Sequence, residues 1–249
     1  GVAMVQKGSE ASKESAGMVL ADDNFASIVA AVREGRTVYD NLMKVISWTL
    51  PTNGGEALTI LGALALGLTL PITPIQILWV NMVTAVALGL ALAFEPTEDG
   101  TMRRPPRRKG QPILTGELLW RVLFVSILFV AGAFGLFFWA ESRGLPVEQS
   151  RTIVVNAIVA MEAFYLFSVR HTHGTAFTAR GFLGTPAVLI GIATVAVAQT
   201  AFTYLPFLQN VFDTRPLSPL DGAAVIGVGI ALLIAAEIEK RVRFAVTRR

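Results

Sequence analysis

The sequence contains no cysteine and few charged residues. The absence of cysteine from all 249 residues excludes disulfide bridges and thiolate metal sites. Only 16% of the residues are Asp, Glu, Lys or Arg, whereas soluble domains contain about 25%. So few charges cannot cover a water-facing surface, which makes a soluble enzyme, a nucleic-acid-binding protein or a disordered tail a poor fit. With 53% hydrophobic residues and a mean hydropathy of +0.58, the sequence predicts a membrane protein.

Long stretches without charge predict the membrane spans. Between Glu56 and Glu95 lie 38 uncharged residues, interrupted only by the Pro-Ile-Thr-Pro segment at residues 71–74. Because a helix needs about 20 residues to cross a bilayer, this stretch predicts two spans joined by a tight proline turn. In total we predict six spans, at about residues 45–70, 74–94, 118–140, 152–169, 186–207 and 219–236.

The distribution of positive charge predicts the orientation. An even number of spans places both ends of the chain on one side of the membrane. Of the 21 Lys and Arg residues, eighteen fall on that side, and only Arg143, Arg151 and Arg215 fall on the other. Because Lys and Arg are enriched in cytoplasmic loops, we expect both termini to be cytoplasmic.

The first 44 residues have the polar content of a water-exposed segment. After a possible helix cap at Asp23 or Asn24, the apolar residues 25, 28, 29 and 32 recur at helical spacing. One βαβ unit alone takes about 30 residues, so this segment is too short for a complete α/β domain. We predict that residues 1–44 are the end of a cytoplasmic α/β domain with a helix leading into the membrane. Residues 45–249 are then a transmembrane domain.

Polar residues at membrane depth mark a candidate site in the first predicted span. Pro51 has no N–H to donate to the carbonyl of Ser47, so we expect the helix to be broken or kinked there. Asn53 and Glu56 are three residues apart and therefore lie on one helix face. A carboxylate, an amide and loosened carbonyls are oxygen ligands suited to a hard cation. The alternative is a buried hydrogen-bonding network that joins helices.

Two other spans carry polar residues of the same kind. Asn81 and Thr84 repeat the three-residue spacing in the second span, although such residues also form hydrogen bonds between helices without binding ions. Glu162 lies near the centre of the fourth span with no Lys or Arg beside it in the same span. Since a charged group at that depth is costly, Glu162 needs a partner helix, a proton or a cation.

Taken together, the polar segments resemble part of a P-type cation-transporting ATPase of the calcium-pump-like branch, bacterial type. Asn53–Glu56, Pro74–Thr84 and Met102–Arg107 are similar to its fifth and sixth membrane helices and the cytoplasmic loop that follows. Segments within residues 1–25 resemble the end of its phosphorylation domain, and residues 204–209 with 216–218 resemble the connection between its ninth and tenth helices. The resemblance covers essentially the whole chain. It implies a mainly α fold: a six-helix transmembrane bundle with a short N-terminal α/β remnant of the phosphorylation domain.

The resemblance also implies a set of cation ligands: Asn53, Glu56, Asn81, Thr84 and Glu162. The transported cation would be Ca²⁺ or another cation. Calcium and sodium pumps carry an Asp directly after the position of Thr84, where this chain has Ala85. The missing carboxylate removes a shared ligand, which favours one divalent ion or a different cation over two calcium ions per cycle.

The implied function is the transport segment of an ATP-driven cation pump in the bacterial plasma membrane. The Asp-Lys-Thr-Gly and Thr-Gly-Asp-Gly motifs of that family do not occur in the 249 residues. Phosphoryl transfer needs these groups, so we expect no ATP hydrolysis by this chain alone. Mg²⁺ and ATP would act on a missing or separately encoded catalytic half. The expected partners of this chain are therefore that catalytic half, the lipid bilayer and the transported cation. No nucleic acid is expected.

Three other functions remain open. A non-transporting scaffold, or the remnant of a degenerate pump gene, has the same composition. A six-span channel would need a filter loop or an Arg-periodic helix, and the sequence shows neither of them. A secondary transporter commonly shows internal repeats, and the sequence shows no such repeat.

Overall fold

The structure is a computed structural model that describes residues 1–98, 100–107, 110, 112–170 and 185–247. Five residues that count toward the predicted charge asymmetry lie outside the described residues: Arg108, Lys109, Arg180, Arg248 and Arg249. The chain divides into two compact units. One consists of Gly1–Asn41 with Pro96–Gln111, and the other of Leu42–Glu95 with Pro112–Arg249.

The first unit contains a small parallel sheet and the beginning of a long helix. Strand β1 (Val2–Met4) pairs in parallel with β2 (Met18–Leu20), and α1 (Glu10–Ser15) connects them. A parallel pair requires such a crossover, because a tight turn can join only antiparallel strands. The long helix α2 (Ala26–Ala65) begins in this unit and continues into the second. The two-stranded sheet and the otherwise helical chain confirm the predicted fold class.

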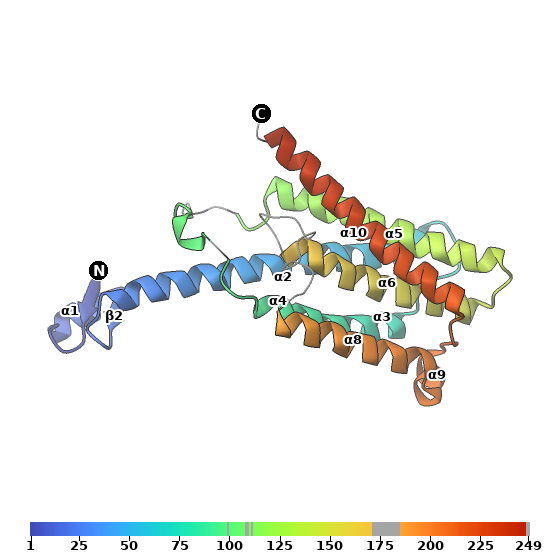
Figure 1. Cartoon of the computed structure of the whole chain (residues 1–249), viewed down its shortest axis with the longest axis horizontal. Helices are drawn as coiled ribbons and strands as arrows, with labels where there is room; N and C mark the ends of the chain where they lie inside the picture. The colour runs from blue at the N-terminus through green and yellow to red at the C-terminus, as the bar shows by residue number, and fades with distance from the viewer. Residues whose placement is uncertain (99, 108–109, 111, 171–184, 248–249) are drawn as a thin grey trace. The chain divides into compact units, whose positions relative to one another are not determined.

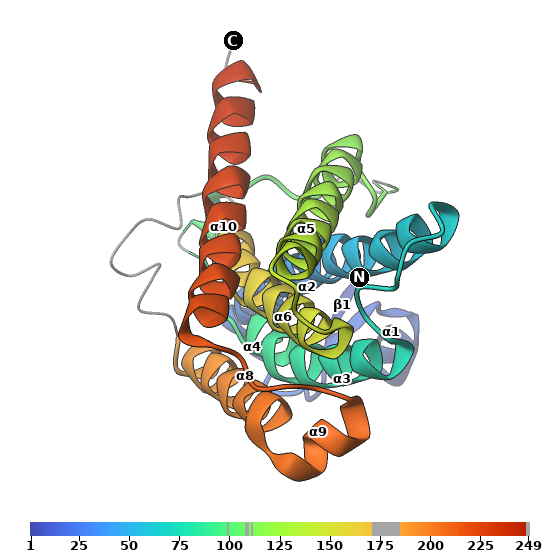
Figure 2. The same cartoon turned by 90° about the vertical axis from the view of Figure 1, so that its right-hand side faces the viewer.

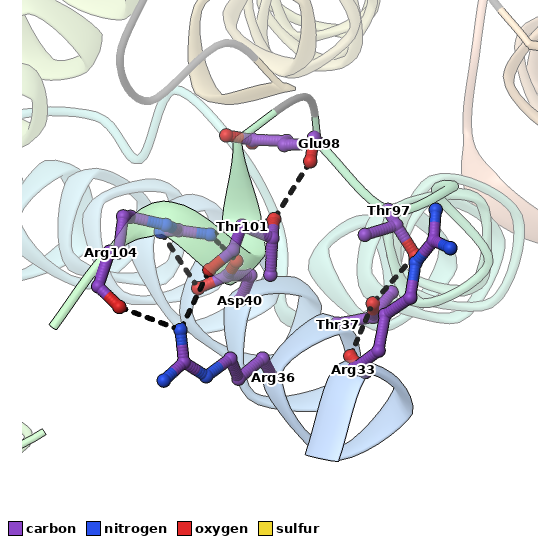
Figure 3. A network of polar contacts seen from close by, with 8 residues as sticks. All are labelled: Arg33, Arg36, Thr37, Asp40, Thr97, Glu98, Thr101 and Arg104. Carbon is purple, nitrogen blue, oxygen red and sulfur yellow. Dashed lines mark hydrogen bonds and ion pairs between the residues drawn. The ribbon is translucent and has the colours of Figure 1, made fainter. Parts of the chain in front are cut away.

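A loop in the same unit is held against α2 by arginine side chains. The loop contains the short 3₁₀ helix η2 (Thr101–Arg103). Arg36 donates hydrogen bonds of 2.8 Å to the backbone carbonyls of Thr101 and Arg104 (Figure 3). Arg104 in turn forms an ion pair with Asp40, one turn further along α2. The loop is therefore held to α2 both through its backbone carbonyls and through the Arg104–Asp40 ion pair.

The second unit is a helical bundle (Figure 1). Its elements after α2 are α3 (Pro74–Thr84), the π-helical turn η1 (Ala85–Gly89), α4 (Leu90–Ala93), α5 (Gly116–Ser142), α6 (Val147–Arg170), α8 (Pro186–Tyr204), α9 (Pro206–Phe212) and α10 (Pro219–Thr247). Helix α6 lies between α5 and α3 in the end view of Figure 2. Its apolar stretch is 72% buried, against 33% in each of the other spans, so α6 is the central helix.

Threonine and proline residues start several of these helices. Thr73 accepts a hydrogen bond from the N–H of Gln76 and Gln76 reaches back to the N–H of Thr73, a capping box that starts α3 at Pro74. Thr115 and Thr185 cap α5 and α8 in the same way with their hydroxyl oxygens.

Three details of the predicted spans need correction. Five helices, rather than six, are long and apolar enough to cross a membrane among the described residues. The span that fails this test is the first, because polar residues and Pro51 interrupt the apolar stretch of α2. This helix also ends at Ala65 instead of residue 70. Finally, we expected α2 to be broken or kinked at Pro51, and it is not broken there, since the helix continues from Ala26 to Ala65.

Candidate functional site

The candidate site begins on the buried face of α2. Glu56 is only 3% exposed, and Thr52 and Thr59 are buried on the same face. Residues 52, 56 and 59 share a face because they are spaced at three and four positions along the helix. The only acidic group in the predicted first and second spans therefore points into the bundle.

Asn81 brings α3 to this carboxylate. Its side-chain Nδ2 donates a hydrogen bond of 2.7 Å to Glu56 Oε2 and a second, of 3.2 Å, to the carbonyl of Ile77. The predicted spans left these two residues about 10 Å apart in depth at 1.5 Å per residue. The early end of α2 removes the offset. Glu56 lies nine residues before Ala65, and Asn81 lies seven after Pro74, a difference of only about 3 Å.

Glu162 approaches from the central helix α6. Its side chain is 1% exposed. It interacts electrostatically with the carboxyl group of Glu56 and with the Thr84 hydroxyl, which itself donates a hydrogen bond of 2.9 Å to the carbonyl of Val80. Trp48 of α2 donates a hydrogen bond of 3.1 Å from Nε1 to the backbone carbonyl of Glu162. Four of the five predicted ligands, from α2, α3 and α6, therefore converge.

Glu56, Asn81, Thr84 and Glu162 form a cluster in which two carboxyl oxygens are buried without a hydrogen-bond partner among the described residues. These atoms are Oε1 of Glu56 and Oε2 of Glu162. Buried polar atoms are nearly always paired, so each exception requires an explanation. A pair of unpaired acceptor atoms on neighbouring carboxyl groups provides the kind of ligand that a hard cation takes. Within the described ranges, no group of three or more His, Cys, Asp or Glu side chains is placed to hold a metal ion.

Asn53 does not join the cluster. Its side chain is exposed on α2 and makes no hydrogen bond to the other four residues within the described part of the chain. Asn53 thus lies off the buried face of α2 that carries Glu56, although the two residues are only three positions apart.

Two residues near the site were missed by the sequence reasoning. Tyr165 is fully buried one turn after Glu162, and Arg121 of α5 is 7% exposed and donates a hydrogen bond of 3.0 Å to its hydroxyl. Arg121 gave a usable signal, since a buried arginine within a membrane helix is as costly as a buried glutamate. From the sequence alone, Arg121 counts only among the positive charges that predict the orientation.

The fold and the site define a polytopic membrane protein with two buried, interacting carboxyl groups inside its helical bundle. A sequence model of the family described as "Cation transporting ATPase, C-terminus" matches residues 69–242. The chain belongs to this family, as the C-terminal segment of a P-type ATPase.

Curated relatives agree with the family match. "Probable cation-transporting ATPase F" of Mycobacterium tuberculosis is 51% identical over 234 residues, covering 94% of this chain and 26% of the relative. "Cation-transporting ATPase pma1" of Synechocystis sp. is 40% identical, covering 87% and 24%. "Calcium-transporting ATPase" of Bacillus subtilis is 35% identical, covering 92% and 26%. The chain spans about a quarter of the length of these relatives.

Proposed function

We propose that this chain is the transport segment of an ATP-driven cation pump, in which Glu56, Asn81, Thr84 and Glu162 contact the transported cation. The observation that carries the proposal is the pair of unpaired carboxyl oxygens on Glu56 and Glu162, buried between α2 and α6. Asn81 orients Glu56 through its 2.7 Å hydrogen bond, and the Thr84 hydroxyl supplies a further oxygen. Asn53, exposed on α2, has no part in this four-residue site.

The donor chemistry favours a hard cation. Carboxylate, amide and hydroxyl oxygens are the ligands that Ca²⁺ takes in proteins, and the B. subtilis relative is named a calcium-transporting ATPase. We propose a divalent cation, with one ion per cycle, because Ala85 follows Thr84 where a further carboxylate would be needed to share two ions.

The remaining parts of the pump cycle belong to the proposal as well. ATP and Mg²⁺ would act on the catalytic part of the pump, and residues 1–44 would be the end of its phosphorylation domain with the helix that leads to the site. The parallel pair β1–β2 supports this assignment. We place the protein in the bacterial plasma membrane with both termini in the cytoplasm.

A chimeric pump tests the proposal. These 249 residues replace the matching segment of the M. tuberculosis relative, and the cation concentration for half-maximal ATPase activity is measured in proteoliposomes. We expect Glu56→Gln to raise this concentration by at least about tenfold, equivalent to ~1.4 kcal/mol of binding free energy. Asn81→Ala should have a smaller effect, since the Asn81 side chain carries no charge.

Thr59→Val is the matched control, since Thr59 lies on the same buried face and its hydroxyl donates a hydrogen bond to the carbonyl of Gly55 in its own helix. It should leave the cation dependence unchanged. Equal cation dependence in the parent chimera and Glu56→Gln would remove the carboxylate from the site and favour the non-transporting scaffold.

A further inference from the structure

The proline in α2 leaves one backbone carbonyl without its helical donor. In an uninterrupted helix the N–H of residue 51 would donate to the carbonyl of Ser47, but Pro51 has no N–H. In a bilayer no water can replace that donor, so a freed carbonyl must be satisfied inside the protein. Nevertheless α2 is helical from Ala26 to Ala65.

A tyrosine from the central helix supplies the missing donor. The hydroxyl of Tyr165 donates a hydrogen bond of 3.1 Å to the carbonyl of Ser47. A second hydroxyl acts one turn later, where Ser126 of α5 donates a hydrogen bond of 2.8 Å to the carbonyl of Pro51. Side chains from two neighbouring helices therefore satisfy the carbonyls on both sides of the proline turn.

Arg121 fixes the direction of the tyrosine hydrogen bond. Its Nε donates to the Tyr165 hydroxyl at 3.0 Å, so the single proton of that hydroxyl is left for the carbonyl of Ser47. The guanidinium is anchored in turn, because Nη2 donates to the hydroxyl of Ser168 at 3.4 Å. Ser168 donates to the buried carboxylate of Glu237 at 2.8 Å. The donor that replaces the proline N–H is thus held by a chain of buried groups.

The same contact connects the two helices that carry the site carboxylates. Tyr165 lies three residues after Glu162 on α6, and Ser47 lies nine residues before Glu56 on α2. A second hydrogen bond joins these helices in the opposite sense, from Trp48 to the carbonyl of Glu162 at 3.1 Å. The two bonds fix the register of α6 against α2, and with it the relation between Glu56 and Glu162.

We infer that Tyr165, oriented by Arg121, is a positioning residue for the cation site: its hydroxyl replaces the N–H that Pro51 lacks and holds Glu56 opposite Glu162. Tyr165 itself is no cation ligand. The inference rests on the proposed function, because the carboxylates must bind the cation for their spacing to affect transport.

Removal of the hydroxyl tests the inference in the chimeric pump described above. Tyr165→Phe keeps the ring and deletes the donor. We expect the cation concentration for half-maximal activity to rise about tenfold, with the maximal rate at saturating cation little changed. Tyr204→Phe is the matched control, since the exposed Tyr204 also donates to a carbonyl, that of Leu217 at 3.3 Å, but away from the site. It should behave like the parent.

The decisive variant restores the backbone donor. Pro51→Ala returns an N–H to position 51, so the Ser47 carbonyl no longer depends on Tyr165. The double variant Pro51→Ala with Tyr165→Phe should therefore recover the cation affinity that Tyr165→Phe loses. Thermal unfolding of the 249-residue chain in detergent should show the same loss and recovery, independently of any cation.

The outcomes separate the inference from the proposed function. An unchanged cation affinity in Tyr165→Phe, alongside a weakened Glu56→Gln, would overturn the inference and leave the proposed function standing. A loss in Tyr165→Phe that Pro51→Ala does not recover would also overturn it. If Glu56→Gln has no effect either, the proposed function fails and the positioning role fails with it.

Discussion

At the scale of single residues, the composition of the cluster sets its charge. Glu56 and Glu162 are its two acidic members, and Asn81 and Thr84 are neutral. Ala85 follows Thr84 at the first position of the π-helical turn η1, and its side chain is exposed. The cluster is therefore short of negative charge compared with a site that binds two divalent ions.

An added carboxylate at position 85 should strengthen cation binding. In the chimeric pump, we expect Ala85→Asp to lower the divalent cation concentration for half-maximal activity about threefold to tenfold, through its attraction for the ion one residue from Thr84. Ala85→Asn is the control of equal size without charge and should have no such effect. A similar change in both variants would show that size rather than charge is responsible.

Some residues of the site could be predicted from the sequence because burying them is costly, and others could not. Glu56 and Glu162 could be predicted because an ionisable side chain in a membrane span is costly wherever it points. The role of Tyr165 could not, since aromatic residues are common in apolar helices and its acceptor is a backbone carbonyl on another helix. Only the packing of α6 against α2 brings that donor and acceptor together.

At the scale of secondary-structure elements, the helix starts that proline marks were predicted better than the end of α2. Pro74, Pro186 and Pro219 begin α3, α8 and α10 at the predicted positions, because proline fits the first helical turn. Thr73 and Thr185 cap the first two of these helices. The end of α2 was predicted five residues too late. Residues 66–70 are apolar apart from Gly67 and Thr69, so hydropathy did not reveal the turn that Gly67 makes with a positive φ of 63°.

A buried ion pair connects three elements at one end of the second unit. Arg170, the last residue of α6, donates a hydrogen bond of 2.8 Å to Glu95 just after α4, and both residues are buried. Thr185, the cap of α8, donates to the same carboxylate oxygen at 3.1 Å. Removal of one partner from a buried ion pair is strongly destabilising, whereas replacement of both by apolar residues of similar size costs much less.

We therefore expect Arg170→Met to lower the free energy of unfolding in detergent by about 3–5 kcal/mol. The double variant Arg170→Met with Glu95→Leu should recover most of that loss. Glu10→Gln serves as the control, because the Lys13–Glu10 pair is exposed and should contribute less than about 1 kcal/mol. Additive losses in the double variant would show that the two charges do not depend on each other.

At the scale of the whole molecule, the second unit has two chemically distinct ends. One end gathers the start of α5 and the ends of α6 and α10 through Arg121, Ser168 and Glu237. At the opposite end, Arg143 pairs with Asp221 at 2.5 Å, and Arg151 donates to the carbonyl of Leu70 at 2.9 Å. Arg143 and Arg151, two of the three arginines that the sequence predicts on the non-cytoplasmic face, thus make their contacts at the same end of the bundle.

This separation of charges leads to a test of the orientation. Because the chain has no cysteine, single cysteines can report which side a site faces. Glu141→Cys and Met102→Cys replace exposed residues and keep the Arg143–Asp221 pair intact. Since positive charges are retained in the cytoplasm, we expect a membrane-impermeant thiol reagent to label position 141 in intact cells. Position 102 should react only after the membrane is permeabilised. The reverse pattern would place the termini outside the cell and would be incompatible with a catalytic part that uses cytoplasmic ATP.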